Sequence, residues 1–259
     1  MYWVDKYLFK TSIEYEYKWV GNYGAKGEKR KPKEKETPEQ TKRQNQINKE
    51  THVRRLIKMN FTEDDFWVTL KHPRGTRITI EEARKEMNTF IRRLRAKYKK
   101  MDEELKFINR LEIGKRGGIH AHIIINRSRG QPDTDRLIRE AWTFGTVHFE
   151  GLHEAGGYVQ LASYICKPPP DDTGQIGMFS EQEKKALSKY SRSRNLKEPV
   201  KERKVYRRWT VRRLIEEGPK PTQGYFIDKD SIRQGVNRYT GMSYLYYTEI
   251  KIKRREPPG

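Results

Sequence analysis

The sequence predicts an α+β fold, in which helices pack mainly on one face of an antiparallel sheet. Within residues 61–170, short runs of β-forming residues alternate with segments whose apolar residues recur at helical spacing. The order is strand, helix, strand, strand, helix, strand, helix. Only five residues join the two middle strands, so these strands form a hairpin. A hairpin beside helices favours an antiparallel sheet over a parallel one.

The first strand and helix of this core have clear boundaries. The apolar run at residues 66–70 predicts a short strand. A helix is predicted over residues 80–99, because Thr79 and Glu82 have the spacing of a capping box. Its apolar residues recur on one side, which predicts the face that packs into the core: Met87, Phe90, Ile91, Leu94 and Tyr98.

The remaining core elements follow the same reasoning. The hairpin has a turn rich in glycine and basic residues, and three prolines stop the last helix. Strands are predicted over residues 106–113, 119–126 and 145–152, and helices over residues 133–142 and 157–167.

The flanks of the core are more polar and divide the chain into three predicted domains. Residues 1–60 combine one or two strands over residues 2–20 with a basic arm, for which a helix over residues 37–57 is an alternative. Residues 61–170 form the core. Residues 171–259 form a basic extension with a helix at 181–190 and a β-rich end at 224–253. The roles of residues 1–60 and 180–259 stay open at this point.

The charge of the chain predicts a polyanionic partner. The 259 residues include 56 Lys and Arg against 35 Asp and Glu, a net charge of +21. Such a surface binds nucleic acid by displacing counterions from phosphates. Aromatic residues make up 11% of the chain and can stack on bases. The alternatives are a charge that serves solubility only, and binding to an anionic membrane surface.

Other classes of protein are excluded or disfavoured. The single cysteine, Cys166, excludes an intrachain disulfide framework and a zinc site with several cysteines. No apolar run approaches the ~20 residues of a membrane span. The first residues do not resemble a signal peptide, because Asp5 stands where the apolar region would begin. We therefore expect a soluble cytoplasmic protein.

A candidate metal site lies in the hairpin. His120 and His122 are two residues apart on a strand, so their side chains share one face. If Ile113 faces Ile119 across the turn, Glu112 faces His120, with Cβ atoms about 4.5–5.5 Å apart. Two imidazoles and a carboxylate with open positions suit Mg²⁺ or Mn²⁺. The alternative is that these are ordinary polar residues of a half-exposed sheet, the role we assign to His52, His72, His148 and His153.

A candidate nucleophile lies on the last helix of the core. Gln160, Tyr164 and Lys167 form one stripe of this helix, separate from its apolar stripe. A phenol with a pKa near 10 is a poor nucleophile at neutral pH. A nearby cation such as Lys167, and a phosphate polarised by a metal, would compensate for that. The alternative is an aromatic residue on the helix surface.

Together these residues resemble the HUH endonuclease superfamily, and within it the single-tyrosine rolling-circle replication initiators, or Rep proteins, of plasmids, phages and other mobile elements. The resemblance covers residues 61–170. Residues 66–70 resemble the first motif of the family, a strand ending near Thr-Leu. His120-Ala121-His122 matches its His-hydrophobic-His motif, and the segment from Tyr164 to Lys167 matches its Tyr-x-x-Lys motif.

The resemblance implies a fold and a reaction. The fold would be a ferredoxin- or RRM-like sheet with the two histidines on its central strand. His120, His122 and Glu112 would hold Mn²⁺ or Mg²⁺ at the scissile phosphate of single-stranded or hairpin origin DNA. Tyr164 would attack the phosphorus, leaving a 5′-phosphotyrosine link and a free 3′-hydroxyl, and Lys167 would orient the phosphate or stabilise the phenolate.

The chain departs from the family pattern in three places. Ala121 is smaller than the usual middle residue of the histidine motif, and no second tyrosine follows at short helical spacing. No Gly-x-x-x-x-Gly-Lys-Ser/Thr motif occurs, so the helicase domain of viral Rep proteins is absent. We therefore expect a host helicase and polymerase as partners.

Two alternatives remain open. A relaxase or transposase would use the same chemistry, and a non-catalytic protein on an RRM-like fold would bind single-stranded nucleic acid without cleaving it. All of these interpretations use basic and polar residues to contact nucleic acid. Our candidates are Lys29, Arg30, Lys31, Lys115, Arg116, Gln160, Arg192, Arg194, Arg207 and Arg208.

Overall fold

The computed structural model divides the chain into two compact units, each with its own five-stranded antiparallel sheet. Unit 1 comprises Met1–Thr41 and Glu198–Gly259, and unit 2 comprises Lys42–Lys197. The two sheets and five α-helices confirm the predicted α+β class. The structure describes residues 1–20, 37–114, 117–153, 155–168, 187, 189–206, 208–237 and 241–252.

Unit 2 contains the predicted core elements in the predicted order. The capping box of α2 (Ile80–Lys100) is formed, with the Glu82 backbone N–H donating to Thr79 Oγ1 at 3.2 Å and the Thr79 backbone N–H donating to the Glu82 carboxylate at 2.8 Å. The other elements are α1 (Pro38–Asn60), β3 (Phe66–Lys71), β4 (Phe107–Ile113), β5 (Ile119–Ile125), α3 (Thr134–Ala141), β6 (Thr146–Gly151), the 3₁₀ turn η1 (Ala155–Tyr158), α4 (Val159–Cys166) and β7 (Tyr190–Arg192).

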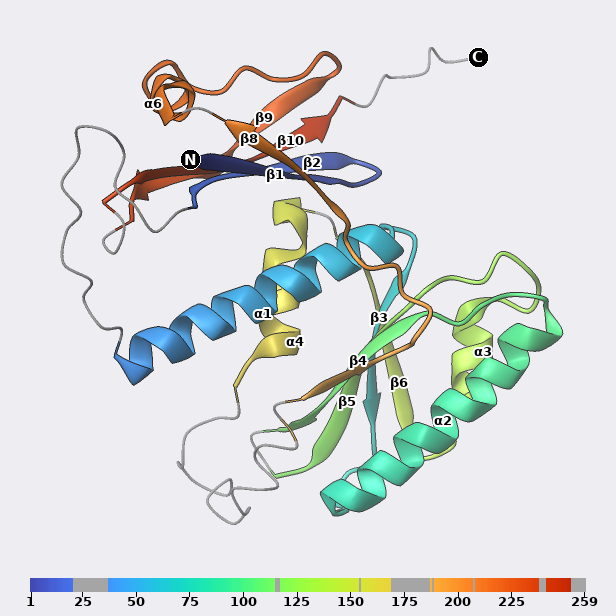
Figure 1. Cartoon of the computed structure of the whole chain (residues 1–259). Coiled ribbons are helices and arrows are strands. Elements are labelled where there is room, and N and C mark those ends of the chain that lie inside the picture. The colour runs from blue at the N-terminus through green and yellow to red at the C-terminus, as the bar shows by residue number, and fades with distance from the viewer. Residues whose placement is uncertain are drawn as a thin grey trace, which may run out of the picture. The chain divides into compact units, whose positions relative to one another are not determined.

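The sheet of unit 2 has the strand order β6-β3-β5-β4-β7, which places the histidine strand β5 at its centre. Helices cover both of its faces, so the prediction of helices mainly on one face was wrong. Helices α2 and α3 pack on one face, around Val68 and Ile123. Helices α1 and α4 pack on the other, around Ile108 and Ile124 (Figure 1).

The physical reason for this correction is visible in β5. Ile123, Ile124 and Ile125 are consecutive and fully buried. Because neighbouring residues of a strand point to opposite faces, an uninterrupted apolar run needs cover on both sides. The helix predicted over residues 181–190 falls largely outside the described residues.

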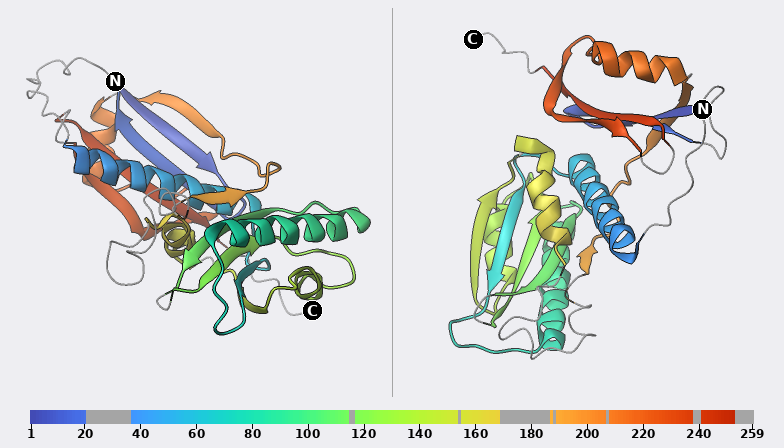
Figure 2. Two further views of the ribbon diagram at one scale, coloured as in Figure 1. Left: turned by 90° about the horizontal axis from the view of Figure 1, so that it is seen from below. Right: turned by 90° about the vertical axis from the view of Figure 1, so that its left-hand side faces the viewer.

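Unit 1 joins the two ends of the chain in one sheet. Its strands are β1 (Tyr2–Leu8), β2 (Ser12–Trp19), β8 (Lys201–Tyr206), β9 (Tyr225–Val236) and β10 (Ser243–Lys251), in the order β8-β1-β2-β10-β9. The helix α6 (Arg208–Glu217) covers one face of this sheet, where Val211 packs among Tyr2, Tyr17 and Leu245 (Figure 2). The predicted strands near both termini are therefore confirmed.

A fully buried carboxylate lies on the other face of the unit 1 sheet. Asp5 accepts hydrogen bonds from Arg203 at 2.5 and 2.8 Å, and Lys18 Nζ lies 3.0 Å away. Burial raises the pKa of Asp5, but the hydrogen bonds and charges of Arg203 and Lys18 outweigh it and lower the pKa to about 2. This carboxylate is neutralised by the protein itself.

No helix in the described part of the chain is both long and apolar enough to cross a membrane.

Candidate metal centre and tyrosine site

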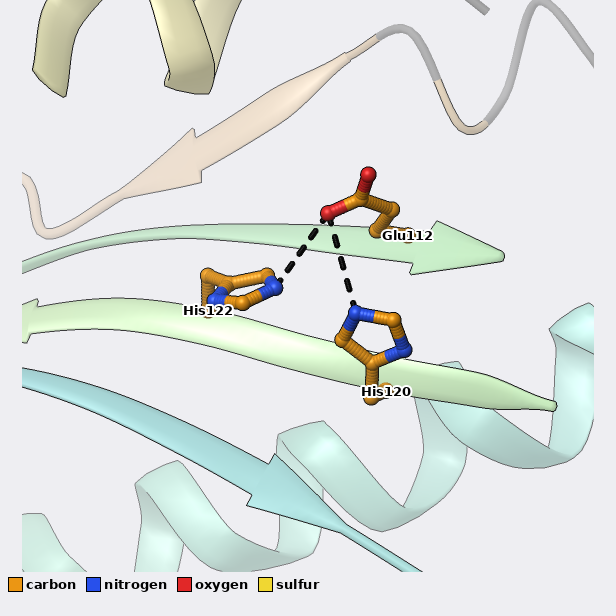
Figure 3. A group of neighbouring side chains, drawn as sticks. All are labelled: Glu112, His120 and His122. Atoms are coloured by element: carbon orange, nitrogen blue, oxygen red, sulfur yellow. Dashed lines mark ion pairs between the residues drawn. The ribbon is translucent and has the colours of Figure 1, made fainter. Parts of the chain in front are cut away.

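The hairpin of β4 and β5 has the predicted register. Ile113 pairs with Ile119, and Glu112 pairs with His120. Glu112, His120 and His122 therefore project from one face of the sheet, and their polar ends converge (Figure 3). This is the face on which α1 and α4 pack.

The three side chains can hold one metal ion. Glu112 Oε2 lies 3.2 Å from His122 Nε2 and 3.7 Å from His120 Nε2, and all three ligand atoms lie within 4.8 Å of one another. Two imidazoles and one carboxylate are a donor set that divalent cations accept, with positions left over for oxygen ligands. The residues present therefore fit the metal that the sequence predicts.

Glu112 is held in its ionised form. Burial raises the pKa of this carboxyl, but hydrogen bonds with His120, His122 and Tyr164 outweigh burial and keep the pKa well below its usual range. Glu112 therefore offers a full negative charge at the point where the imidazoles meet. Among the described residues, its side-chain partners are imidazoles and a phenol, whereas those of Asp5 are Arg and Lys.

Two residues of β3 fix the orientation of His122. Thr69 pairs with His122 in the sheet, and its hydroxyl lies 3.1 Å from His122 Nδ1. The indole of Trp67 stacks on the imidazole at 5.2 Å, with an angle of 13° between the planes. Because Nδ1 is bonded to Thr69, Nε2 is the nitrogen that faces Glu112, which is the arrangement typical of metal-binding histidines.

Helix α4 brings Tyr164 to the same point. The phenol donates a hydrogen bond to Glu112, and its oxygen lies 2.8 Å from His122 Nε2. Burial, the hydrogen bond to Glu112 and the negative charge of Glu112 all raise the pKa of Tyr164. Without a cation at the site, Tyr164 is therefore a protonated phenol.

Arg110 connects α4 to the sheet. It is 3% exposed, pairs with His122, and donates from Nη1 to the backbone carbonyls of Tyr164 at 2.9 Å and Ile165 at 3.2 Å. The last carbonyls of a helix have no partner within the helix, and a cation beside them is favourable. Arg110 thereby fixes the turn that carries Tyr164.

Sequence reasoning missed Arg110 and assigned no contact to Trp67 or Thr69. The signal for Arg110 was the register itself, since the pair two positions beyond Glu112–His120 on the two strands is Arg110–His122. The contacts of Trp67 and Thr69 depend on how β3 pairs with β5, which the hairpin pattern does not contain.

Lys167 and the predicted DNA contacts are placed as follows. Lys167 follows α4 and is exposed; within the described residues, no contact joins its ammonium group to Tyr164 or to the three ligand residues. Gln160 is exposed one turn before Tyr164. Arg192 is half-buried in β7, and Arg194 is exposed. Lys29, Arg30, Lys31, Lys115, Arg116 and Arg207 lie outside the described residues, as does the side chain of Arg208 at the start of α6.

One comparison with known proteins finds a match. Residues 65–169 match a family model described as Replication-associated protein ORF2. Neither a curated protein nor a solved structure matches the chain. The matched segment runs from just before β3 to just beyond α4 and contains Glu112, His120, His122 and Tyr164. The part of unit 2 that forms the candidate site is therefore similar to replication-associated proteins of this family.

Proposed function

We propose that this protein initiates rolling-circle replication by nicking and rejoining single-stranded DNA at an origin. The observation that carries the proposal is the position of Tyr164, whose hydroxyl contacts Glu112 and His122 within the segment that matches the replication family. A surface aromatic residue would have no reason to meet two of the three ligand residues.

The proposed reaction is a transesterification. The phenolic oxygen of Tyr164 forms a bond to the scissile phosphorus as the bond to the 3′ oxygen breaks. The proton that the phenol loses is balanced by the proton that the 3′ oxygen gains. The products are a 5′-phosphotyrosine link and a free 3′-hydroxyl, and the reverse reaction rejoins the strand.

Glu112, His120 and His122 would hold Mn²⁺ or Mg²⁺ in this reaction. When bound, the metal supplies positive charge to the non-bridging oxygens of the phosphate. Trp67 and Thr69 keep His122 Nε2 directed at the site, and Arg110 keeps Tyr164 within reach. The exposed Lys167 would orient the phosphate from outside.

The topology supports the finer fold assignment that we propose, a ferredoxin- or RRM-like core. From β3 to β6 the elements run strand, helix, strand, strand, helix, strand. This is the ferredoxin-like order. In the sheet these strands lie in the order β6-β3-β5-β4, and α2 and α3 share one face. Origin DNA, a host helicase and a polymerase remain the proposed partners.

Replacing the tyrosine tests the reaction. We expect Tyr164→Phe to abolish cleavage of single-stranded oligonucleotides in Mn²⁺, as seen on a denaturing gel, while DNA binding stays within about twofold. Tyr158→Phe is the matched control, because Tyr158 lies just before α4 and packs into the apolar core. Full cleavage by Tyr164→Phe would remove Tyr164 from the mechanism.

The same experiment separates the alternatives. A non-catalytic binding protein would hold the oligonucleotides without cleaving them or forming a covalent adduct. A relaxase or transposase would also form the adduct, so the identity of the cleaved sequence, recovered from the adduct, has to distinguish these enzymes from a replication initiator.

A further inference from the structure

One row of side chains crosses the unit 2 sheet through the candidate site. Backbone pairing places Thr146 opposite Lys71, Lys71 opposite His120, and His120 opposite Glu112. Directly opposed residues project from the same face, with Cβ atoms about 4.5–5.5 Å apart. Lys71 therefore lies beside the ligand residue His120, on the side away from Glu112.

The row is closed on the β4 side and open on the β6 side. The side chains of Glu112 and His120 are each 21% exposed, and Tyr164 of α4 contacts Glu112. On β6, the side chains of His148 and Glu150 are 65% and 56% exposed, and Thr146 and Lys71 are also exposed. Within unit 2, a DNA strand thus has its free approach to His120 over β3 and β6.

The end of β3 carries a cluster of cations at this approach, which we name the cationic rim: Lys71, Arg74 and Arg77. All three are exposed, and within the described residues none has a carboxylate partner. The nearby acids are engaged elsewhere, since Glu82 caps α2 and Glu86 pairs with His72 at 2.6 Å.

The position of Lys71 is fixed by its neighbour Gly145. A Cβ atom on Gly145 would lie 2.1 Å from the Lys71 carbonyl oxygen. Only glycine permits so close an approach of the two backbones. Lys71 is therefore part of the packed sheet end, with its ammonium group on a flexible stem.

From these observations we propose that the cationic rim binds the phosphates next to the scissile phosphate, with Lys71 on the nearest one. The inference rests on the proposed function, because it takes single-stranded DNA as the ligand. It assigns the strand a path across β3 and the loop that follows it. Charge complementarity favours this ligand, since the three cations of the rim line an opening that leads to a site for phosphate.

Lys71→Met tests the proposal, with Lys85→Met as the matched control. Lys85 is equally exposed but lies on α2, which covers the opposite face of the sheet. Both variants are made in full-length Tyr164→Phe protein, which cannot cleave. The probe is the single-stranded oligonucleotide that binds most tightly in a random pool. We expect Lys71→Met to raise the Kd about tenfold and to reduce the log–log salt slope by about 0.7, and Lys85→Met to change the Kd less than twofold.

A scan of methylphosphonates locates the contact. Each substitution removes the charge of one phosphate from the probe. We expect one substitution to weaken binding to the Lys71 protein and to have no further effect in Lys71→Met. Equal losses in both proteins at every phosphate, or equal Kd values for Lys71→Met and Lys85→Met, would overturn the proposal.

Failure of this inference is distinguishable from failure of the proposed function. An adduct on Tyr164 of the otherwise unchanged protein, together with equal binding by the two lysine variants, rejects the cationic rim and keeps the nickase. Coupling between Lys71 and one phosphate without any adduct rejects the nickase and keeps the rim as a DNA-binding site. Absence of DNA binding rejects both.

Discussion

Each of the two sheets carries a carboxylate with hydrogen-bonded partners, and the partners differ. In unit 1, Asp5 is bonded to Arg203 and Lys18, so its charge is neutralised within the protein. In unit 2, Glu112 meets two imidazoles and a phenol. The first arrangement is complete without a ligand and stabilises a sheet. The second keeps an ionised carboxylate beside two nitrogen donors, which is an arrangement that can take up a cation.

The largest effect should come from removing the charge of Glu112. We expect Glu112→Gln to lower both Mn²⁺ affinity and the rate of cleavage by about 100-fold or more, because the amide keeps the shape but loses the charge that attracts the ion. Titration with Mn²⁺ followed by electron paramagnetic resonance measures the affinity. Asp5→Asn is the matched control and should leave Mn²⁺ binding unchanged. Equal losses in both variants would contradict the distinction between the two carboxylates.

A somewhat smaller effect is expected from Arg110. Arg110→Met removes the hydrogen bonds to the carbonyls of Tyr164 and Ile165, so the phenol is less well positioned. We expect the single-turnover cleavage rate to fall about 100-fold, since misplacing a reacting group by about 1 Å has an effect of this size. DNA affinity and Mn²⁺ affinity should stay within about threefold. Arg110→Lys should recover part of the rate, because one donor remains.

An equal fall in DNA or Mn²⁺ affinity would show that Arg110 maintains the whole site rather than the position of Tyr164. The thermal unfolding of Arg110→Met has to be measured alongside, because a buried cation that loses its partners can also affect stability.

Asp5→Asn should act on stability and not on catalysis. The variant weakens a buried, charged hydrogen-bond cluster, which lowers the free energy of unfolding by about 2 kcal/mol. Chemical denaturation measures this change. Cleavage of single-stranded DNA by the folded variant should equal that of the unchanged protein. Loss of cleavage in a folded variant would show that Asp5 has a role beyond unit 1.

The smallest effect is a dependence of stability on pH. The pKa of Asp5 is lowered to about 2 in the folded protein, so its stabilisation is fully present above the ordinary pKa near 3.8 and is lost as the pH falls toward 2. We expect a loss of about 2 kcal/mol between pH 5 and pH 2 that is missing in Asp5→Asn. Identical pH profiles for the two proteins would contradict this assignment.

Local patterns were sufficient to predict the core of unit 2 and the three ligand residues. The capping box at Thr79, the apolar spacing of α2 and the five-residue turn of the hairpin are features of neighbouring residues. Once Ile113 is placed opposite Ile119, the pairing of Glu112 with His120 follows from strand geometry alone.

Contacts between distant segments were not available from such patterns. The pairing of β1 with β8, and of β2 with β10, joins residues that lie about 200 positions apart, and periodicity does not specify a partner strand. The stacking of Trp67 on His122 likewise depends on the pairing of β3 with β5. The run of isoleucines in β5 indicates cover on both faces, but the order of elements favours cover on one, and the sequence does not decide between them.

Mass spectrometry of the protein after incubation with single-stranded oligonucleotides tests the central claim most directly. One sample contains Mn²⁺ and the other contains a chelator. The account predicts a nucleotide adduct on Tyr164 with Mn²⁺ and no adduct with the chelator. An adduct on another residue, an adduct that persists with the chelator, or tight binding without any adduct would contradict it.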